Sequence, residues 1–154
     1  MDAILLFSHG SVLCGAERNL LAVAERMRAR GDAPVVEVGF LNYIEPLFAT
    51  AVRRCVDAGA TRVRIAPYFL IAGKFVVQDL PAAIAAVREE HPAVEFSVAE
   101  VIGFHPALAE AIVSSAENAR PTSAWRGELA ASAEWCRENP KCPLHGSAGC
   151  KGSA

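Results

Sequence analysis

Hydrophobic residues along this chain fall into short apolar runs that alternate with segments of helical periodicity. Four of the runs have strand length, and apolar residues recur every three to four positions in the segments between them. Alternation of this kind is typical of βαβ units, in which helices join parallel strands. The predicted strands cover residues 3–8, 35–41, 62–67 and 94–99.

Residues that favour helix ends set the limits of the predicted helices. Gly31 and Gly59 each follow a periodic segment, and glycine is common just beyond a helix C-terminus. Pro46 favours the first helical position, so a helix is predicted to begin there with Glu45 at its entrance. The predicted helices cover about residues 16–30, 46–58 and 79–90, and a fourth contains Leu108, Ala111 and Ile112.

These elements predict an α/β fold in three layers, with a flavodoxin-like, four-stranded parallel sheet and helices on both faces. The periodic pattern fades near Glu117, and the segment that follows contains turn-forming residues and three of the five cysteines. We therefore expect one domain over residues 1–117 and an irregular C-terminal appendage over residues 118–154.

Composition narrows the class of protein. Of the 154 residues, 53% are hydrophobic and 21% are charged, and the formal net charge of -2 offers no case for a nucleic-acid-binding surface. No apolar run approaches the length that crosses a membrane, and the N-terminus lacks the pattern of a signal peptide. We therefore expect a cytoplasmic protein that binds neither nucleic acid nor membranes.

Three side chains suited to chemistry follow three successive predicted strands. His9 follows the first strand, Glu45 the second, and a loop containing Lys74 the third. Because the carboxyl ends of parallel strands meet at one edge of a sheet, these residues are expected to converge. A neutral imidazole and a carboxylate bind divalent first-row metals and accept protons near neutral pH. The alternatives are that His9 bonds the loop backbone and that Glu45 caps a helix.

Two other kinds of chemistry receive little support. Gly10 and Gly15 have the glycine spacing of a phosphate-binding loop, but the lysine and the serine or threonine that must follow are missing. Nucleophilic catalysis by Ser11 or Cys14 needs a base held beside the nucleophile, and the sequence establishes none. The pattern therefore favours a reaction that uses no nucleotide.

The segment that follows the third strand is too apolar for an ordinary solvated loop. This apolar loop, residues 68–78, includes three aromatic and five aliphatic side chains and is predicted to line a pocket or a partner surface. Further along, His105 precedes Pro106 and is expected to mark the entry of a helix rather than to bind a metal.

Five short motifs follow one another along the chain. They are Phe7-Ser8-His9-Gly10-Ser11, Val38-Gly39-Phe40-Leu41 with Glu45-Pro46, Pro67-Tyr68-Phe69-Leu70-Ile71-Ala72-Gly73, Asp79-Leu80-Pro81 and Gly103-Phe104-His105-Pro106-Ala107-Leu108. In order and spacing they resemble the small, single-lobe sirohydrochlorin cobaltochelatases and ferrochelatases, over a span from Ile4 to about Ser115.

The resemblance implies a chelatase-like fold and the insertion of a divalent metal, cobalt, iron or nickel, into a sirohydrochlorin-type tetrapyrrole. It implies that His9 is the metal ligand and proton acceptor and that Glu45 is the accompanying carboxylate. It also implies a homodimer whose cleft lies between two copies of the lobe.

One position departs from the family pattern. These chelatases usually present a second metal-binding histidine after the segment that corresponds to Leu70-Ile71-Ala72-Gly73, where this chain has Lys74 and then Phe75 at the expected position. Two interpretations stay open, an active chelatase in which His9 and Glu45 suffice, and a non-catalytic carrier of metal or tetrapyrrole. We favour the chelatase because both ligands remain. The expected substrate contacts are Ser11, Tyr68, Phe69, Lys74 and Phe75, and a solvated loop lysine is the alternative for Lys74.

The appendage contains a second cluster of possible ligands. Cys136, Cys142, His145 and Cys150 lie close enough in sequence to surround one zinc ion or to share an iron-sulfur cluster. A tail that carries reactive thiols without a metal is the alternative.

Overall fold

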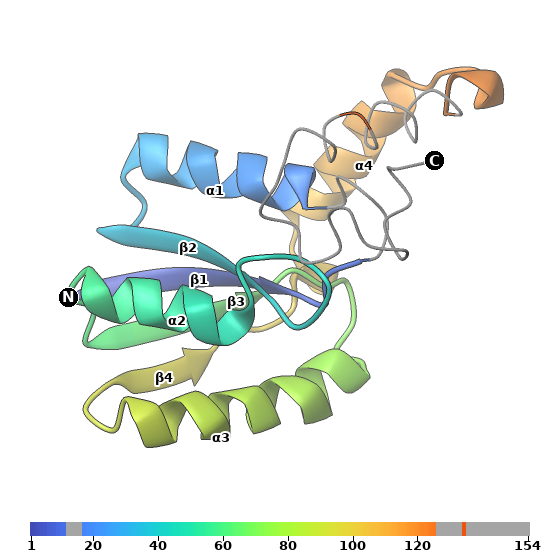
Figure 1. Ribbon diagram of the computed structural model, residues 1–154. Coiled ribbons are helices and arrows are strands. Elements are labelled where there is room, and N and C mark those ends of the chain that lie inside the picture. Colours follow the sequence, from blue (N-terminus) through green and yellow to red (C-terminus); the bar gives the residue numbers. More distant parts are fainter. Residues whose placement is uncertain (12–16, 126–133, 135–154) are drawn as a thin grey trace.

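A parallel four-stranded sheet forms the centre of the computed structural model, which describes residues 1–11, 17–125 and 134 (Figure 1). The strands lie in the order β2-β1-β3-β4, which places the first strand inside the sheet. Their bounds are Asp2–Ser8 for β1, Val35–Phe40 for β2, Arg62–Pro67 for β3 and Glu95–Val98 for β4.

Helices lie on both faces of the sheet, as the sequence predicts. Figure 1 shows α1 on one face and α2 and α3 on the other, so the three-layer α/β prediction is confirmed. The α-helices are α1 (Arg18–Arg30), α2 (Phe48–Asp57), α3 (Leu80–Glu90) and α4 (Ala107–Glu117). Three short helices complete the described elements: the π-helix η1 (Phe75–Asp79) and the 3-10 helices η2 (Ile102–Phe104) and η3 (Thr122–Ala124).

Alternation along β1 divides the core into two clusters. Ala3, Leu5 and Phe7 point to the face covered by α2 and α3, where they pack with buried residues of both helices. Leu6 points to the opposite face and packs with α1 through Leu20. Because successive side chains of a strand point to opposite faces, an apolar run such as β1 is buried on both sides.

The connection between β2 and α2 differs from the prediction. A helix beginning at Pro46 is wrong, because the Phe40 amide donates to the Pro46 carbonyl oxygen over 3.0 Å and Phe40 forms a bridge with Leu47. The Glu45–Pro46 peptide bond is cis. The segment therefore returns to the end of β2, and α2 begins only at Phe48.

The other boundary differences are smaller, except at the start of the third helix. β2 and β4 end one residue earlier than predicted, and the predicted helix from residue 79 is preceded by the π-helix η1. Helical periodicity does not distinguish an α-helix from the single π-turn that begins this element.

α4 projects away from the sheet (Figure 1). None of its residues is buried, and Ile112 and Val113 are 65% and 57% exposed.

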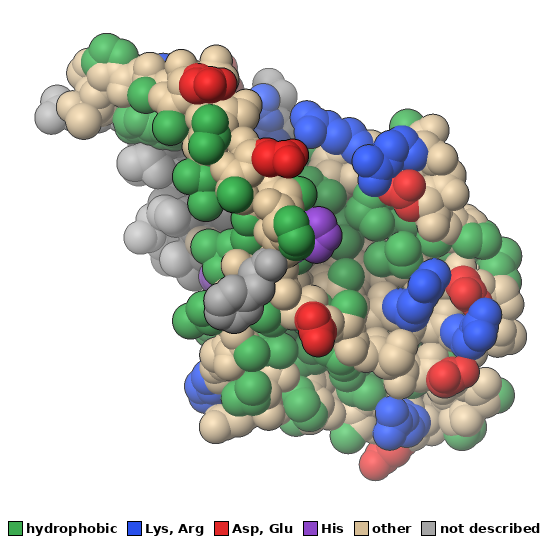
Figure 2. Space-filling view, turned by 180° about the vertical axis from the view of Figure 1, so that it is seen from behind, with side chains coloured by type: hydrophobic (Ala, Val, Ile, Leu, Met, Phe, Trp, Pro, Cys, Tyr) green, Lys and Arg blue, Asp and Glu red, His purple; other side chains and the backbone are tan. Residues whose placement is uncertain are grey.

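Charged side chains of β3 and β4, among them Arg62, Arg64 and Glu95, are also exposed. Figure 2 shows basic and acidic side chains spread over the back of the molecule. Within the described part of the chain, no helix is long and apolar enough to cross a membrane.

Candidate active site at the carboxyl edge of the sheet

His9 stands directly after β1, and the loops after the two neighbouring strands are bonded to the same point. The Asn42 amide donates to the His9 carbonyl oxygen over 3.1 Å, and the Tyr68 amide donates to the Phe7 carbonyl oxygen over 2.7 Å. The parallel topology therefore brings all three loops to one edge, as predicted, and leaves the His9 side chain exposed there.

Gly10 is required for this arrangement. Its φ of 78° lies in the left-handed region, and a Cβ atom at this position would collide with the carbonyl oxygen of Asn42. The close approach of the two loops therefore explains why a glycine follows His9 in the first motif.

Three aromatic rings form one cluster at the edge. The His9 imidazole stacks on the Phe75 ring with centroids 5.0 Å apart and an angle of 24° between the planes. The Phe69 ring lies 5.9 Å from His9 and 6.1 Å from Phe75. The position at which a second histidine was expected thus does lie beside His9, and it is filled by a ring that cannot bind a metal.

The Glu45 carboxylate is hydrogen-bonded to the backbone two residues further along the chain. Its Oε2 accepts a hydrogen bond from the Leu47 amide over 2.8 Å, immediately before α2 begins. This contact agrees in part with the alternative that Glu45 caps a helix, although Leu47 itself occupies the capping position. Among the described residues, no group of three or more histidine, cysteine, aspartate or glutamate side chains is arranged to hold a metal.

Lys74 is paired rather than free. Its Nζ lies 3.1 Å from each carboxylate oxygen of Asp79, and its side chain is 69% exposed. Tyr68, Leu70 and Ile71 of the same loop are also exposed. The apolar loop therefore presents a large unburied surface next to His9, as its composition predicts.

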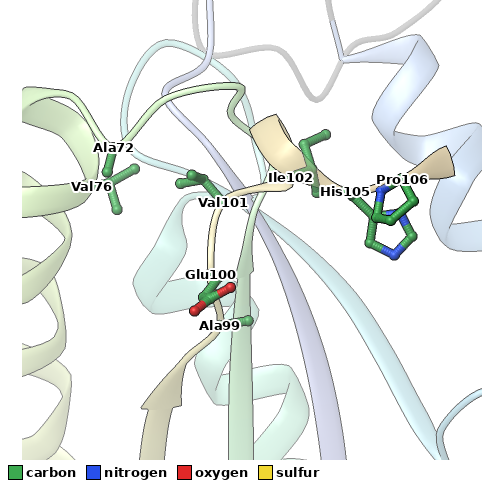
Figure 3. Close-up of a pocket in the computed structure, with 8 residues that line it drawn as sticks. All are labelled: Ala72, Val76, Ala99, Glu100, Val101, Ile102, His105 and Pro106. Carbon is green, nitrogen blue, oxygen red and sulfur yellow. The ribbon is translucent and has the colours of Figure 1, made fainter. Parts of the chain in front are cut away.

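Two cavities open near this edge. Ser11 and His9 line a small one of about 120 Å³ together with Ser8, Gly10, Phe40 and Ile44. A larger one of about 620 Å³ lies between residues of the apolar loop and the segment that follows β4 (Figure 3). It is lined by Ala72, Val76, Ala99, Glu100, Val101, Ile102, His105 and Pro106.

Sequence reasoning missed the larger cavity, although the Gly103 motif contained a signal. A Cβ atom on Gly103 would collide with the Leu70 carbonyl oxygen, and the Ile102 amide donates to the Phe69 carbonyl oxygen over 3.1 Å. η2 is thus held against the apolar loop. The Nδ1 atom of His105 accepts a hydrogen bond from the Ala107 amide over 3.2 Å, which confirms its expected place at a helix entry.

Within the part of the chain that the structure describes, the cysteine offers nothing to this site. Cys55 is buried in the core, and loss of solvent around the thiol raises its pKa to about 12, so it stays protonated and unreactive at neutral pH. Cys14 and the predicted tail ligands Cys136, Cys142, His145 and Cys150 lie outside the described residues.

Comparisons with known proteins agree with these observations. The CbiX family model matches residues 3–119. A sirohydrochlorin cobaltochelatase of Methanocaldococcus jannaschii is 32% identical over 91 residues, which are 59% of this chain and 64% of the relative. A sirohydrochlorin ferrochelatase of Priestia megaterium is 32% identical over 113 residues, which are 73% of this chain and 42% of the relative.

A solved structure supports the same relationship. SirB from Bacillus subtilis, determined with Fe3+, superposes with a TM-score of 0.68 at 31% identity and covers 73% of this chain and 45% of its own. The chain thus spans between 42% and 64% of the length of these relatives. The family match over most of the chain, the shared fold and the motifs around His9 confirm the resemblance seen in the sequence, and the chain belongs to the CbiX family.

Proposed function

We propose that this protein inserts a divalent metal, cobalt, iron or nickel, into a sirohydrochlorin-type tetrapyrrole without using a nucleotide. The observation that carries the proposal is the exposed His9 imidazole, set among flat aromatic rings at the carboxyl edge of the sheet. Relatives that share this fold are named for the insertion of cobalt or iron into sirohydrochlorin.

His9 has two tasks in the proposed reaction. One ring nitrogen binds the incoming metal, and once the metal has passed to the macrocycle the same nitrogen accepts one of the two protons that leave the inner pyrrole nitrogens. Glu45 is the proposed second metal ligand, a carboxylate, and accepts the other proton. It is only half-buried, and its Oε1 is outside the hydrogen bond to Leu47, so one oxygen is available for this task.

The surroundings of His9 suit a large flat substrate with acidic edges. Tyr68, Phe69 and Phe75 supply apolar surface for the face of the macrocycle, and Ser11 lines the small cavity beside His9. Lys74 supplies a positive charge at the rim for a peripheral carboxylate, with the Asp79 carboxylate as its partner in the absence of substrate.

We further propose that two copies of the chain assemble into a homodimer that completes the cleft. The apolar residues Ile112 and Val113 on α4 and Ile71 in the loop, which is 75% exposed, support this assembly. The longer relatives support it too, because this chain aligns with only 42% of the Priestia ferrochelatase and leaves room there for a second lobe. Ile112→Glu is expected to convert the dimer to a monomer in light scattering, and a monomeric wild-type protein would contradict the assembly.

The test of the reaction is an absorbance assay with sirohydrochlorin and Co2+, Fe2+ or Ni2+. The wild-type protein is expected to convert many equivalents of tetrapyrrole, and His9→Ala is expected to lose insertion with each metal while its circular dichroism stays unchanged. His91→Ala is the matched control, because His91 lies in the turn after α3 at the opposite end of the sheet. Equal insertion rates in His9→Ala and the wild type would refute the assignment.

A specific observation favours a second candidate function. Among the described residues, Phe75 occupies the place beside His9 where a second imidazole was expected, which suits a protein that carries a metal or a tetrapyrrole without turning it over. The same assay separates the two functions, because a carrier shifts the spectrum of one equivalent of sirohydrochlorin and then stops.

A further inference from the structure

The ion pair between Lys74 and Asp79 spans a single π-turn. The two residues are five positions apart. The amide of Leu80, the residue after Asp79, donates to the carbonyl oxygen of Phe75 in the i to i+5 pattern of a π-helix. In an α-helix, side chains five positions apart differ by about 140° around the axis and do not face each other. The π-turn therefore brings these two side chains closer together around the axis than an α-helix would.

The same turn decides where the Phe75 ring lies. Leu80 is fully buried and anchors the start of α3 in the core. Phe75 is the first residue of the π-helix, and the turn between Phe75 and Leu80 contains one residue more than a turn of α-helix. If the turn relaxed to an α-helical one, residues before it would rotate by about 100° relative to Leu80, and the Phe75 ring would leave the His9 imidazole.

We propose that Lys74 and Asp79 form a positioning pair that holds the π-turn and thereby keeps Phe75 stacked on His9. The positioning of Phe75 by this pair does not depend on the proposed function. Its consequence rests on that function: the plane of the metal-binding imidazole is set before the substrate arrives. Neither residue of the pair touches reacting atoms in this task. The pair acts through Phe75.

The first test uses the full chain without tetrapyrrole or metal. In a proton NMR spectrum, the ring current of Phe75 displaces the carbon-bound ring protons of His9, and Phe75→Leu gives their positions without the ring. Lys74→Met and Asp79→Asn are each expected to move the His9 signals at least halfway to the Phe75→Leu positions. The charge-exchanged double variant Lys74→Asp with Asp79→Lys is expected to move them back toward the wild-type positions.

Salt provides an independent version of this test. An ion pair with a lysine this exposed is screened at high ionic strength, so 1 M sodium chloride, where the screening length is about 3 Å, is expected to shift the wild-type His9 signals in the direction of Asp79→Asn. In Asp79→Asn itself, salt is expected to have little further effect. His9 signals that stay at the wild-type positions in Lys74→Met and Asp79→Asn would overturn the proposal.

The insertion assay then separates positioning from substrate binding. A positioning pair predicts that Asp79→Asn lowers kcat several-fold and that the charge-exchanged variant recovers kcat. If Lys74 acts only on a substrate carboxylate, Lys74→Met raises KM, the exchanged variant does not recover it, and the His9 signals of the free protein stay unchanged. Absence of any insertion in the wild type would refute the proposed function and leave the NMR result on the positioning pair intact.

Discussion

The His9 imidazole and the Phe75 ring lie face to face, with centroids 5.0 Å apart and planes inclined by 24°. Of the aromatic rings that the structure describes, Phe75 thus lies nearest to the proposed metal ligand, at the place where the resemblance to sirohydrochlorin chelatases predicts a second histidine. Phe75 turns a potential two-imidazole site into a single imidazole supported by an apolar ring.

A histidine at position 75 is expected to strengthen metal binding. Phe75→His would place a second imidazole nitrogen beside His9, and imidazole is a strong ligand for divalent first-row metals. Co2+ affinity, measured by competition with a coloured chelator, is expected to rise at least about tenfold, or about 1.4 kcal/mol. Phe75→Leu is the control and is expected to bring no gain. Equal affinities in Phe75→His and Phe75→Leu would show that position 75 cannot share a metal with His9.

The glycine after His9 permits a matched test of crowding. Gly10 and Gly31 have similar φ values of 78° and 72°, but a Cβ atom meets the Asn42 carbonyl oxygen at Gly10 and nothing within 4 Å at Gly31. Gly31→Ala is expected to cost about 1–2 kcal/mol of unfolding free energy from backbone strain alone. Gly10→Ala is expected to cost clearly more in urea denaturation and to displace His9. Similar losses for both variants would mean that the loops separate easily.

A second glycine pair tests the attachment of the apolar loop. A Cβ atom on Gly103 would collide with the Leu70 carbonyl oxygen, whereas one on Gly73 in the same loop meets nothing within 4 Å. Gly103→Ala is expected to lose about 1–3 kcal/mol of stability and to raise KM for the tetrapyrrole, because η2 can no longer pack against the loop. Gly73→Ala is expected to change stability little. The prediction fails if Gly103→Ala leaves both the melting temperature and KM at their wild-type values.

The sheet could be predicted well from the sequence because each buried strand corresponds to a run of consecutive apolar residues. β1 is apolar on both faces, and such runs between helical segments specify a parallel sheet with little ambiguity. The position of His9 follows from the same pattern, since the carboxyl ends of parallel strands all lie at one edge of the sheet. The family motifs supplied the other residues of the candidate site.

The errors lie where distant contacts override local preference. Pro46 favours a helix start in isolation, but its carbonyl oxygen accepts a hydrogen bond from Phe40 and moves that start to Phe48. The π-turn escaped prediction because one extra residue hardly changes an apolar pattern, although the spacing of Lys74 and Asp79 carried the signal. Helix propensity depends on the residue type and its close neighbours in sequence, so it does not reflect either contact.

Burial of Cys55 makes a prediction about alkaline pH. Loss of solvent, with a smaller contribution from the nearby Glu37 charge, raises the pKa of this thiol from 9.0 to about 12. Above pH 9 the unfolded chain releases the thiol proton while the folded chain keeps it, so the unfolded state binds fewer protons and stability falls as pH rises. The contribution is fully present below pH 9 and is lost between pH 9 and about 12.

This loss can be isolated by comparison with a variant that lacks the thiol. The slope of unfolding free energy against pH, from urea denaturation between pH 8 and about pH 10.5, is expected to be steeper for the wild type than for Cys55→Ala by up to about 1.4 kcal/mol per pH unit. The difference between the two proteins cancels the titration of lysine and tyrosine, which both share. The same burial predicts that a thiol reagent modifies Cys55 only after unfolding. Parallel slopes would show that solvent reaches this thiol in the folded protein and that the α2 face of the core is less tightly packed than the fully buried Cys55 side chain indicates.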